Sequence, residues 1–342
     1  MRAVLYDQPR SWTIADLPMP PADPGEVRIR VGQVGVCGTD LHIHEGEFEA
    51  AYPLIPGHEL VGTVDALGDG VEGPRVGEQV TVNPNVECGL CAYCRAGRPI
   101  QCQNLKGMGS SYPGFFAEYV SVPARLVYST EGLHPDVAVF TEPAACAMHG
   151  LESLDVRPGS STLVLGAGPT GLLLAQMIGS GGAASVTVAA PTRFKLDTAL
   201  ALGIDQVVQL ERGADDATTT ALLRAGSPTG DGYDAVVEAT GSARIGSLCV
   251  PLTRNGGTVL VYGVTGPEDR WTISPLDVFR REIRIQGSFA EISSFDAAIA
   301  ALRSGRARTT GMITHRFGLD EYADALDAVA NDRSTHKVLI AP

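Results

Sequence analysis

The chain has 342 residues, enough for two ordinary domains, and its 40 glycines and 44% hydrophobic residues are typical of a soluble globular α/β protein. A formal net charge of −13 argues against a nucleic-acid-binding protein and gives no reason to expect attraction to anionic membranes. Because no apolar run is long enough to span a bilayer and the first residues lack the apolar core of a signal peptide, we expect a cytoplasmic location.

The first third of the chain is predicted to be rich in β-strands. Apolar and charged residues alternate in residues 26–31 (EVRIRV), which is the period of a half-buried strand. Short apolar segments follow at residues 60–64 and 79–82, and glycine and proline separate them. This pattern indicates a partly open antiparallel barrel.

Strands and helices alternate in the next part of the chain. Strands are predicted at residues 162–166, 185–190, 206–210, 233–238, 258–262 and 283–289, and helices at residues 169–178 and 193–202. This alternation predicts a doubly wound parallel sheet, the Rossmann architecture of α/β proteins. The remainder, with a helix at 295–303 and a strand at 337–340, is too small for a domain of its own, so we expect it to complete the first domain.

A glycine-rich segment, residues 166–171 (GAGPTG), directly follows a predicted strand and opens a predicted helix. In such a motif the first glycine allows a tight turn, the second admits a pyrophosphate and the third allows close helix–strand packing. We therefore expect a dinucleotide to bind here, although the motif alone also occurs in structural loops. The residues expected to contact the cofactor are Gly166, Gly168, Pro169, Thr170 and Gly171.

The end of the second strand indicates which dinucleotide is preferred. An acidic side chain there would hold the ribose 2′-hydroxyl of NAD, but this chain has Ala190, followed by Arg193 and Lys195. No carboxylate would repel a 2′-phosphate, and two cations could pair with one. The sequence thus favours NADP over NAD, unless Arg193 and Lys195 are only solvated helix residues.

Four of the seven cysteines, Cys88, Cys91, Cys94 and Cys102, lie within fifteen residues. In a reducing compartment such a cluster is typical of a metal site rather than of disulfides. Four thiolates around one zinc ion form a closed structural site, with no position left for substrate. An iron–sulfur cluster is the competing interpretation, but its usual run continues with three residues and Cys-Pro, whereas here seven residues intervene.

Cys37, His58 and Glu59 form a sparser group of potential ligands. Zinc accepts a thiolate, an imidazole and a carboxylate, and three protein ligands would leave the open position of a catalytic site. Taken singly, Cys37 could be a small buried apolar residue and the His-Glu pair a solvated turn, so the residues alone leave this site open.

Five motifs together carry a resemblance to a known family: residues 36–42 (VCGTDLH), residues 57–59 (GHE), the four cysteines, the pair Glu142–Pro143, and residues 166–171. In this order and spacing the chain resembles, along its whole length, the medium-chain zinc-dependent dehydrogenases. Within that superfamily it is most similar to the polyol (sorbitol, xylitol, arabinitol) and threonine dehydrogenases, because Gly38 follows the first zinc cysteine and Glu59 directly follows His58.

The resemblance implies a role for each matching residue. It makes Cys37, His58 and Glu59 ligands of a catalytic zinc ion, and Glu142 either the fourth ligand or a partner of the zinc-bound water. It makes Thr39 the hydroxyl that contacts the substrate oxygen and His42 the end of a proton relay. The second zinc ion of the chain would be structural, with Cys88, Cys91, Cys94 and Cys102 as its ligands.

The implied fold is a GroES-like β-barrel catalytic domain carrying the zinc sites at residues 1–148 and a Rossmann dinucleotide-binding domain at residues 149–286. Residues 287–342 would return to complete the catalytic domain. The implied assembly is a homo-oligomer, a tetramer or a dimer, with no nucleic-acid or membrane partner.

The implied reaction is hydride transfer between a secondary alcohol, such as a polyol or sugar alcohol, or its ketone, and NAD(P), with zinc lowering the pKa of the alcohol. An L-threonine 3-dehydrogenase-like enzyme is the alternative. A zinc-free quinone or enone reductase would lack the zinc ligands, and a non-enzymatic nucleotide-sensing or crystallin-like protein is a further alternative. Candidate pocket residues, each also a core candidate, are Phe48, Phe116 and Phe289, and we interpret His44 as a surface histidine.

Overall fold

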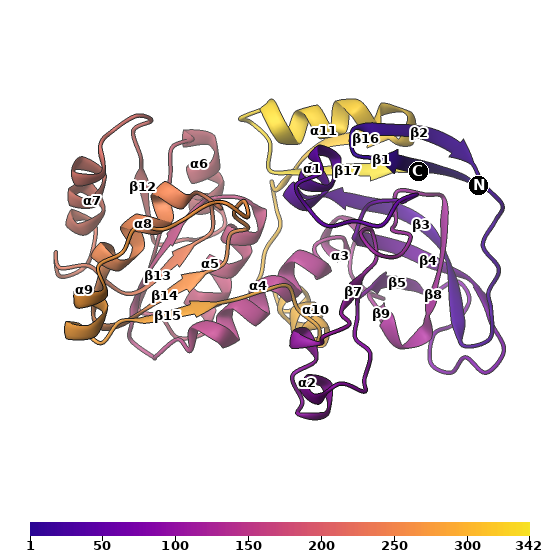
Figure 1. Cartoon of the computed structure of the whole chain (residues 1–342), viewed down its shortest axis with the longest axis horizontal. Helices are drawn as coiled ribbons and strands as arrows, with labels where there is room; N and C mark the ends of the chain where they lie inside the picture. The colour runs from indigo at the N-terminus through magenta and orange to yellow at the C-terminus, as the bar shows by residue number, and fades with distance from the viewer. The chain divides into compact units, whose positions relative to one another are not determined.

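A computed structural model describes all residues, 1–342, and the chain divides into two compact units. Unit 1 comprises residues 1–145, 291–303 and 312–342, and unit 2 comprises residues 146–290 and 304–311. Unit 2 holds a parallel sheet and unit 1 a mostly antiparallel one, so the predicted α/β fold is confirmed (Figure 1). No helix combines the length and the apolar character needed to cross a membrane.

Unit 1 is built around one large sheet with the strand order β16-β17-β3-β4-β5-β9, in which β8 also pairs with β3. Its strands are β1 (Arg2–Gln8), β2 (Ser11–Asp16), β3 (Glu26–Val36), β4 (Glu59–Leu67), β5 (Gln79–Val82), β6 (Asn85–Val86), β7 (Lys106–Gly107), β8 (Tyr119–Pro123), β9 (Val127–Ser129), β16 (Ile313–Gly318) and β17 (Lys337–Ala341). Its helices are α1 (Gly38–Glu45), α2 (Ala92–Arg95), α3 (Pro135–Ala138), α10 (Phe295–Arg303) and α11 (Tyr322–Asn331), and the start of α4 (Thr141–Leu154) also belongs to it.

The last strand of the chain lies next to one of the first. β17 pairs antiparallel with β3, opposite Val34 to Val36, and β4 pairs with the other edge of β3. β3 is therefore a central strand, and buried residues alternate with more exposed ones up to Gly32, after which residues 33–36 are buried on both faces. This explains why it extends to Val36, beyond the range of the predicted alternation.

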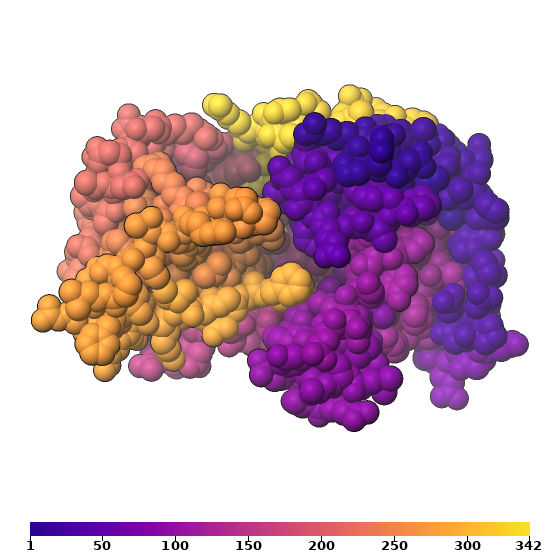
Figure 2. Space-filling model, in the orientation of Figure 1, coloured from indigo at the N-terminus to yellow at the C-terminus, as the bar shows by residue number.

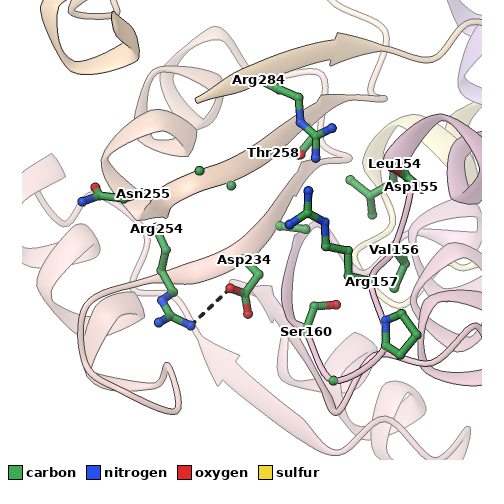
Figure 3. Close-up of a pocket in the computed structure, with 15 residues that line it drawn as sticks. Leu154, Asp155, Val156, Arg157, Ser160, Asp234, Arg254, Asn255, Thr258 and Arg284 are labelled. Carbon is green, nitrogen blue, oxygen red and sulfur yellow. Dashed lines mark hydrogen bonds and ion pairs between the residues drawn. The ribbon is translucent and has the colours of Figure 1, made fainter. Parts of the chain in front are cut away.

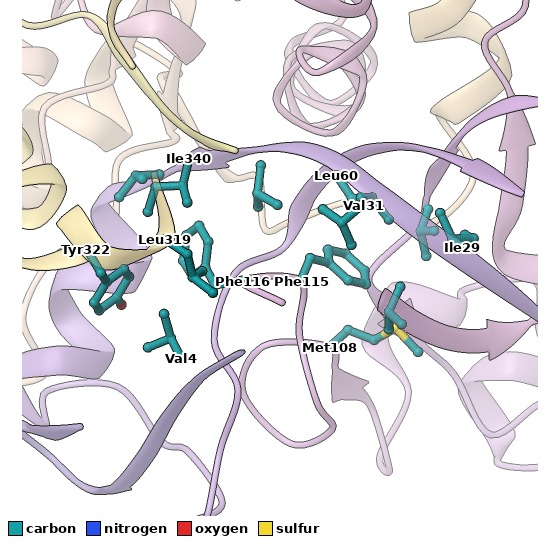
Figure 4. Packing of buried hydrophobic residues seen from close by; sticks show 14 of the residues in the cluster. Val4, Ile29, Val31, Leu60, Met108, Phe115, Phe116, Leu319, Tyr322 and Ile340 are labelled. Atoms are coloured by element: carbon teal, nitrogen blue, oxygen red, sulfur yellow. The ribbon is translucent and has the colours of Figure 1, made fainter. Parts of the chain in front are cut away.

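The core of unit 1 packs aliphatic side chains of this sheet around a few aromatic rings (Figure 4). Phe116 and Tyr322 are fully buried there, with ring centroids 5.3 Å apart in an edge-to-face arrangement. Phe116, which the sequence left as either a pocket or a core residue, is thus a core residue. Phe48 is partly buried against the same cluster. Phe289 is 62% exposed and is therefore not a core residue, so of its two interpretations only a place in a pocket stays a prediction.

His44 is a further correction to the sequence-based interpretation. It is half-buried, and its Nδ1 lies 2.7 Å from the hydroxyl of the fully buried Tyr6. The interpretation as a surface histidine was wrong because a buried tyrosine hydroxyl needs a hydrogen-bond partner, and α1 turns this face of His44 toward the core.

Unit 2 contains six parallel strands in the order β12-β11-β10-β13-β14-β15, with helices on both faces (Figure 1). The strands are β10 (Ser161–Leu165), β11 (Ser185–Ala190), β12 (Gln206–Gln209), β13 (Tyr233–Glu238), β14 (Thr253–Val261) and β15 (Arg284–Gly287). The helices that lie between them are α5 (Pro169–Ser180), α6 (Arg193–Ala201), α7 (Asp216–Ala225), α8 (Ala243–Leu252) and α9 (Pro275–Arg280). Each strand predicted here exists, within a few residues at its ends except for β14, which begins five residues earlier.

The strand order explains the apolar sequence of the central strands. All five residues of β10 are buried, because β11 and β13 flank it and helices cover both faces. From β10 the chain adds β11 and β12 on one side, and then β13, β14 and β15 on the other side, so the strand order reverses between β10 and β13. In a doubly wound sheet a ligand binds at the carboxyl ends of the strands at such a switch point.

Gly246 inside α8 provides a test of this packing. A Cβ at that position would collide with the indole of Trp271, which packs on the core of unit 2. Gly246→Ala should therefore destabilise the protein by about 1–3 kcal/mol, although alanine favours helix. The matched control is Gly179→Ala in α5, where the nearest atom is 3.7 Å away, so that this variant should gain about 0.5–1 kcal/mol. Thermal unfolding of both variants measures the effects, and equal shifts in Tm would contradict the packing at Trp271.

Candidate metal centres and dinucleotide site

The pairing of β3 with β4 brings Cys37 and His58 together. Cys37 directly follows β3 and is the N-cap of α1, and His58 directly precedes β4. The two strands are antiparallel with Gly35 opposite Glu59, so the end of one lies beside the start of the other. Candidate ligand atoms of Cys37, His58 and Glu59 all lie within 4.8 Å of one another.

These three residues fit a zinc ion in donor chemistry and spacing. With bonds of 2.0–2.3 Å, the ligand atoms of a tetrahedral zinc ion are roughly 3.3–3.8 Å apart. The three side chains thus need only small adjustments to share one ion, and they leave a fourth position open.

Asp40 lies behind His58 and was not recognised from the sequence. It is fully buried, its Oδ2 accepts a hydrogen bond from the Cys37 amide at 2.8 Å, and its Oδ1 lies 3.5 Å from His58 Nδ1. Burial opposes a charge on His58, but Asp40 raises its pKa well above the ordinary value. An acidic partner on Nδ1 orients an imidazole so that Nε2 is available to a metal, which displaces the proton.

Lys337 forms a buried ion pair with Glu59, and this pair too was missed. Its Nζ lies 2.6 and 2.7 Å from the two carboxylate oxygens, and both side chains are at most 4% exposed. Glu59 is on β4 and Lys337 is on β17, and these two strands lie on opposite sides of β3. The two side chains meet next to Gly35 of β3, where any side chain would collide with the Glu59 carboxylate. Burial opposes the charge on Lys337, but Glu59 and then Cys37 raise its pKa.

The ion pair bears on the role expected of Glu59. Both oxygens of Glu59 contact Lys337, so to bind a metal one of them would have to contact the metal and Lys337 at the same time. This is possible because each carboxylate oxygen has two lone pairs. The assignment of Glu59 as a direct ligand therefore stays a prediction. Nothing in the local sequence pointed to Lys337, since 278 residues separate the partners.

The other expected catalytic residues lie on helices that begin near the ligands. Thr39 is in the first turn of α1, with its hydroxyl 3.8 Å from Cys37 Sγ. His42 is one turn further on, with Nδ1 2.8 Å from Glu47 and a side chain that is 35% exposed. Glu142 is buried in the first turn of α4.

Glu291 is a second buried carboxyl group that the sequence did not reveal. It is fully buried, and one of its oxygens has no hydrogen-bond partner. Burial, followed by the charge of Glu142, raises its pKa to about 8. Glu291 is therefore mostly protonated at neutral pH.

The four clustered cysteines converge in a lobe between β6 and β7 that protrudes from unit 1 (Figure 2). Their sulfur atoms lie 3.4 Å (Cys88–Cys102), 3.6 Å (Cys91–Cys94) and 3.9 Å (Cys91–Cys102) apart. These distances bracket the roughly 3.8 Å between sulfurs of a tetrahedral zinc–thiolate site, and all are too long for a disulfide of about 2.05 Å. All seven cysteines of the chain are free.

Backbone amides prepare this cluster for a cation. Amides of Cys88 and Asn104 donate to Cys102 Sγ at 3.3 Å, and amides of Leu90 and Cys91 lower the pKa of Cys88 to about 6. By contrast, desolvation and then the neighbouring sulfurs raise the pKa of Cys94 to about 12. Four thiolates thus repel one another unless a metal ion offsets their charge.

The glycine-rich segment of unit 2 forms a tight turn between β10 and α5. Gly166 has φ +120°, which favours glycine, and a Cβ at Gly171 would lie 2.6 Å from the Gly166 carbonyl oxygen. Gly168, the N-cap of α5, has no atom near its missing Cβ, which leaves space above the helix N-terminus. A pyrophosphate would fit there, with Pro169 and Thr170 in the first helical turn.

The residues around Ala190 only partly follow the expectation for a 2′-phosphate site. Ala190 is buried at the end of β11, and Arg193 forms an ion pair with Asp197 at 2.6 Å. Arg212, which follows β12, reaches the start of α6, where its Nη2 donates to Thr192 Oγ1 at 3.1 Å. Arg193 was predicted because it is close to Ala190 in the sequence, and Arg212 was missed. The parallel pairing of β11 with β12 brings Arg212 to the same carboxyl edge of the sheet as Ala190.

Comparisons with known proteins agree with this arrangement. The family described as alcohol dehydrogenase GroES-like domain matches residues 23–132, and the zinc-binding dehydrogenase family matches residues 169–304. The chain is also 43% identical to D-arabinitol dehydrogenase 1 of Uromyces fabae, over 100% of this chain and 97% of the relative. The chain belongs to the medium-chain zinc-dependent dehydrogenases. Within this superfamily it falls in the polyol and threonine dehydrogenase branch, as the sequence motifs indicated.

Two further relatives extend the comparison. L-threonine 3-dehydrogenase of Anaeromyxobacter dehalogenans is 32% identical over 96% of this chain and 94% of the relative. A crystal structure of a zinc-binding dehydrogenase from Sinorhizobium meliloti 1021 bound to NADP has a TM-score of 0.93 and 32% identity, and it covers 100% of this dehydrogenase and 99% of its own chain. These matches confirm the predicted enzyme class and the GroES-like and Rossmann folds.

Replacing Lys337 tests the buried ion pair. Lys337→Met should destabilise the protein by about 3–5 kcal/mol, because it leaves the carboxylate of Glu59 buried without a partner. The double variant with Glu59→Gln should recover much of that loss, since it removes the uncompensated charge. Denaturant unfolding after chelation of metal measures both values.

The control for this experiment is a partly exposed ion pair of the same unit. Asp65→Asn breaks the contact of Asp65 with Arg28 at 2.6 Å, whose side chains are 31% and 24% exposed, and it should cost no more than about 1 kcal/mol. A Lys337→Met variant no less stable than this control would show that the buried pair does not support the fold.

Proposed function

We propose that this dehydrogenase interconverts a polyol, such as a pentitol, and the corresponding ketose. The observation that carries the proposal is the set of Cys37, His58 and Glu59, which offers three zinc ligands and an open position within a chain that also has a dinucleotide-binding turn. The similarity to D-arabinitol dehydrogenase, 43% against 32% for the threonine enzyme, favours a polyol over an amino alcohol.

Cys37, His58 and Glu59, with Glu142 as an alternative ligand, would hold the catalytic zinc ion. Zinc there supplies a Lewis acid that lowers the pKa of an alcohol, and the dinucleotide supplies the hydride acceptor. Thr39 is suited to accept a hydrogen bond from the reacting hydroxyl, because its Oγ1 lies beside Cys37. His42, hydrogen-bonded to Glu47 and partly exposed, is suited to pass the proton to solvent.

The four-cysteine lobe would hold a second, structural zinc ion. Its sulfur spacing fits zinc, and four thiolates complete the coordination, so no position remains for substrate. The small helices and turns of the lobe bury little apolar surface of their own, which supports a stabilising role for the ion.

The cofactor is proposed to be NADP. Ala190 leaves no carboxylate to repel a 2′-phosphate, and the Sinorhizobium relative was crystallised with NADP. Because Arg193 is engaged by Asp197, we assign the 2′-phosphate contact mainly to Arg212, with Lys195 as a further cation.

A cytoplasmic homo-oligomer, either a dimer or a tetramer, remains the proposed state of the protein. The seven free cysteines support a reducing compartment, where thiolate clusters stay available to metals. A small-molecule alcohol or ketone is the proposed partner.

Cys37→Ser provides the principal test of the function. It should reduce kcat with polyol substrates by about a thousandfold or more, because the zinc ion that activates the alcohol is lost, while NADPH binding is retained. Turnover should be measured on metal-analysed protein with D-arabinitol, other polyols, simple secondary alcohols and L-threonine, each with NAD and NADP. Highest kcat/KM for L-threonine would select the amino-alcohol alternative.

Cys91→Ser is the matched control, since it removes one thiolate from the other cluster. It should lower zinc content and Tm but affect kcat far less than Cys37→Ser does. Substantial turnover by Cys37→Ser at full zinc content would rule out the proposed catalytic site, and a stable Cys91→Ser variant with normal zinc content would rule out the structural one.

Cofactor preference tests the assignment of Arg212. Arg212→Gln should lower kcat/KM for NADP roughly 10- to 100-fold and leave that for NAD nearly unchanged, because only the 2′-phosphate loses a charge-assisted hydrogen bond. Ala190→Asp should shift preference in the same direction by repelling the 2′-phosphate. Arg193→Gln is the control, and a larger effect there than at position 212 would return the assignment to Arg193.

A further inference from the structure

Unit 2 contains a cavity of about 400 Å³ that lies away from the glycine-rich turn. Its walls come from residues 154–160, which precede β10, and from the first residues of β13, β14 and β15. In a parallel sheet these are the amino ends of the strands. The dinucleotide turn follows the carboxyl end of β10, roughly 17 Å away for a strand of five residues.

Three arginines line this cavity, and two of them have no partner. Arg254 forms ion pairs with Asp234 at 3.2 Å and Asp231 at 3.4 Å. Arg157 and Arg284 line the same cavity but make no side-chain hydrogen bond or ion pair within the chain. Figure 3 shows their guanidinium groups extending toward one another from opposite walls.

Three arginines and two carboxylates, Asp155 and Asp234, line the cavity, so its lining carries a net positive charge, whereas the net charge of the chain is −13. Asp234 is already engaged, because it binds Arg254 and accepts two hydrogen bonds at 2.8 Å from the amide and hydroxyl of Ser161. Two guanidinium groups that face one another repel unless an anion lies between them. Their planar forks are the usual donors to phosphate.

A threonine hydroxyl adds a neutral donor beside the arginines. Thr258 lines the cavity, is only 5% exposed, and its hydroxyl makes no hydrogen bond within the chain. Figure 3 places it next to Arg284. Ser160 Oγ, at the entrance to β10, is also buried without a partner. Buried polar groups rarely stay unsatisfied, so a ligand or ordered solvent is expected to supply the acceptor that Ser160 Oγ lacks.

We infer that this cavity is a second ligand site that binds a small phosphate monoester, with Arg157 and Arg284 holding the phosphate group and Thr258 donating to it. The volume is that of a small-molecule site rather than of a bare ion. The site is independent of the proposed polyol oxidation, since it uses none of the catalytic or cofactor-binding residues.

Isothermal titration of the zinc-loaded enzyme, saturated with NADP so that the cofactor site is filled, tests the inference. Glucose 6-phosphate is the probe, and glucose and inorganic phosphate are the matched arms. We expect glucose 6-phosphate to bind, inorganic phosphate to bind more weakly, and glucose not to bind. Absence of glucose 6-phosphate binding would overturn the inference, and equally tight binding of inorganic phosphate would overturn the assignment to an organic phosphate.

Substitutions locate the binding. Arg157→Gln with Arg284→Gln should weaken glucose 6-phosphate binding by at least about tenfold, because both charge-assisted contacts are lost. Both side chains are exposed, so the variant should keep the wild-type Tm. The charge-matched control is Arg280→Gln with Arg306→Gln, two exposed arginines outside the cavity. Equal weakening in both double variants, or no weakening in the first, would refute the site.

Discussion

The ion pair between Glu59 and Lys337 is the constraint on which unit 1 depends. Removing two charges from water costs several kcal/mol per ion, and only close pairing in good geometry offsets that cost. Here the pairing needs three strands in register, with β4 and β17 on either side of β3 and no side chain at Gly35. The last strand of the chain therefore cannot be replaced by any apolar strand of equal length, because it brings the cation.

The same pair shapes the metal site. Cys37, Asp40, Glu59 and Glu142 place four acidic groups close together, of which Lys337 pairs with Glu59 and His58 with Asp40. A divalent cation is the natural complement of the remaining charge. Because Lys337 is paired with Glu59, the carboxylate is oriented before any metal binds. Hydrogen-bond partners of metal ligands commonly orient the ligands in this way.

Local patterns in the sequence were sufficient to predict most of the fold and to single out candidate metal ligands, although Cys37, His58 and Glu59 were assigned only through the resemblance to the family. Period-two alternation and apolar runs located the strands, and the ligand motifs are short segments whose members lie close in the chain. What could not be predicted are side chains that meet only through strand pairing, namely Lys337 on Glu59 and Arg212 on Thr192. The partial burial of His44 and the exposure of Phe289 could not be predicted for a related reason, because burial depends on which element packs against a residue in the folded chain.

The parallel sheet of unit 2 presents two edges of different chemistry. At the carboxyl edge, glycines open space above a helix N-terminus, so backbone amides receive an anion without any charged side chain. At the amino edge the backbone offers no such converging amides, and an anion site there must be built from side chains. Arg157 and Arg284 supply these charges from the loop before β10 and from the start of β15. All five residues of β10, which runs between the two edges, are buried, and Leu163 and Leu165 pack into the core of unit 2, so packed protein rather than solvent separates the two anion sites.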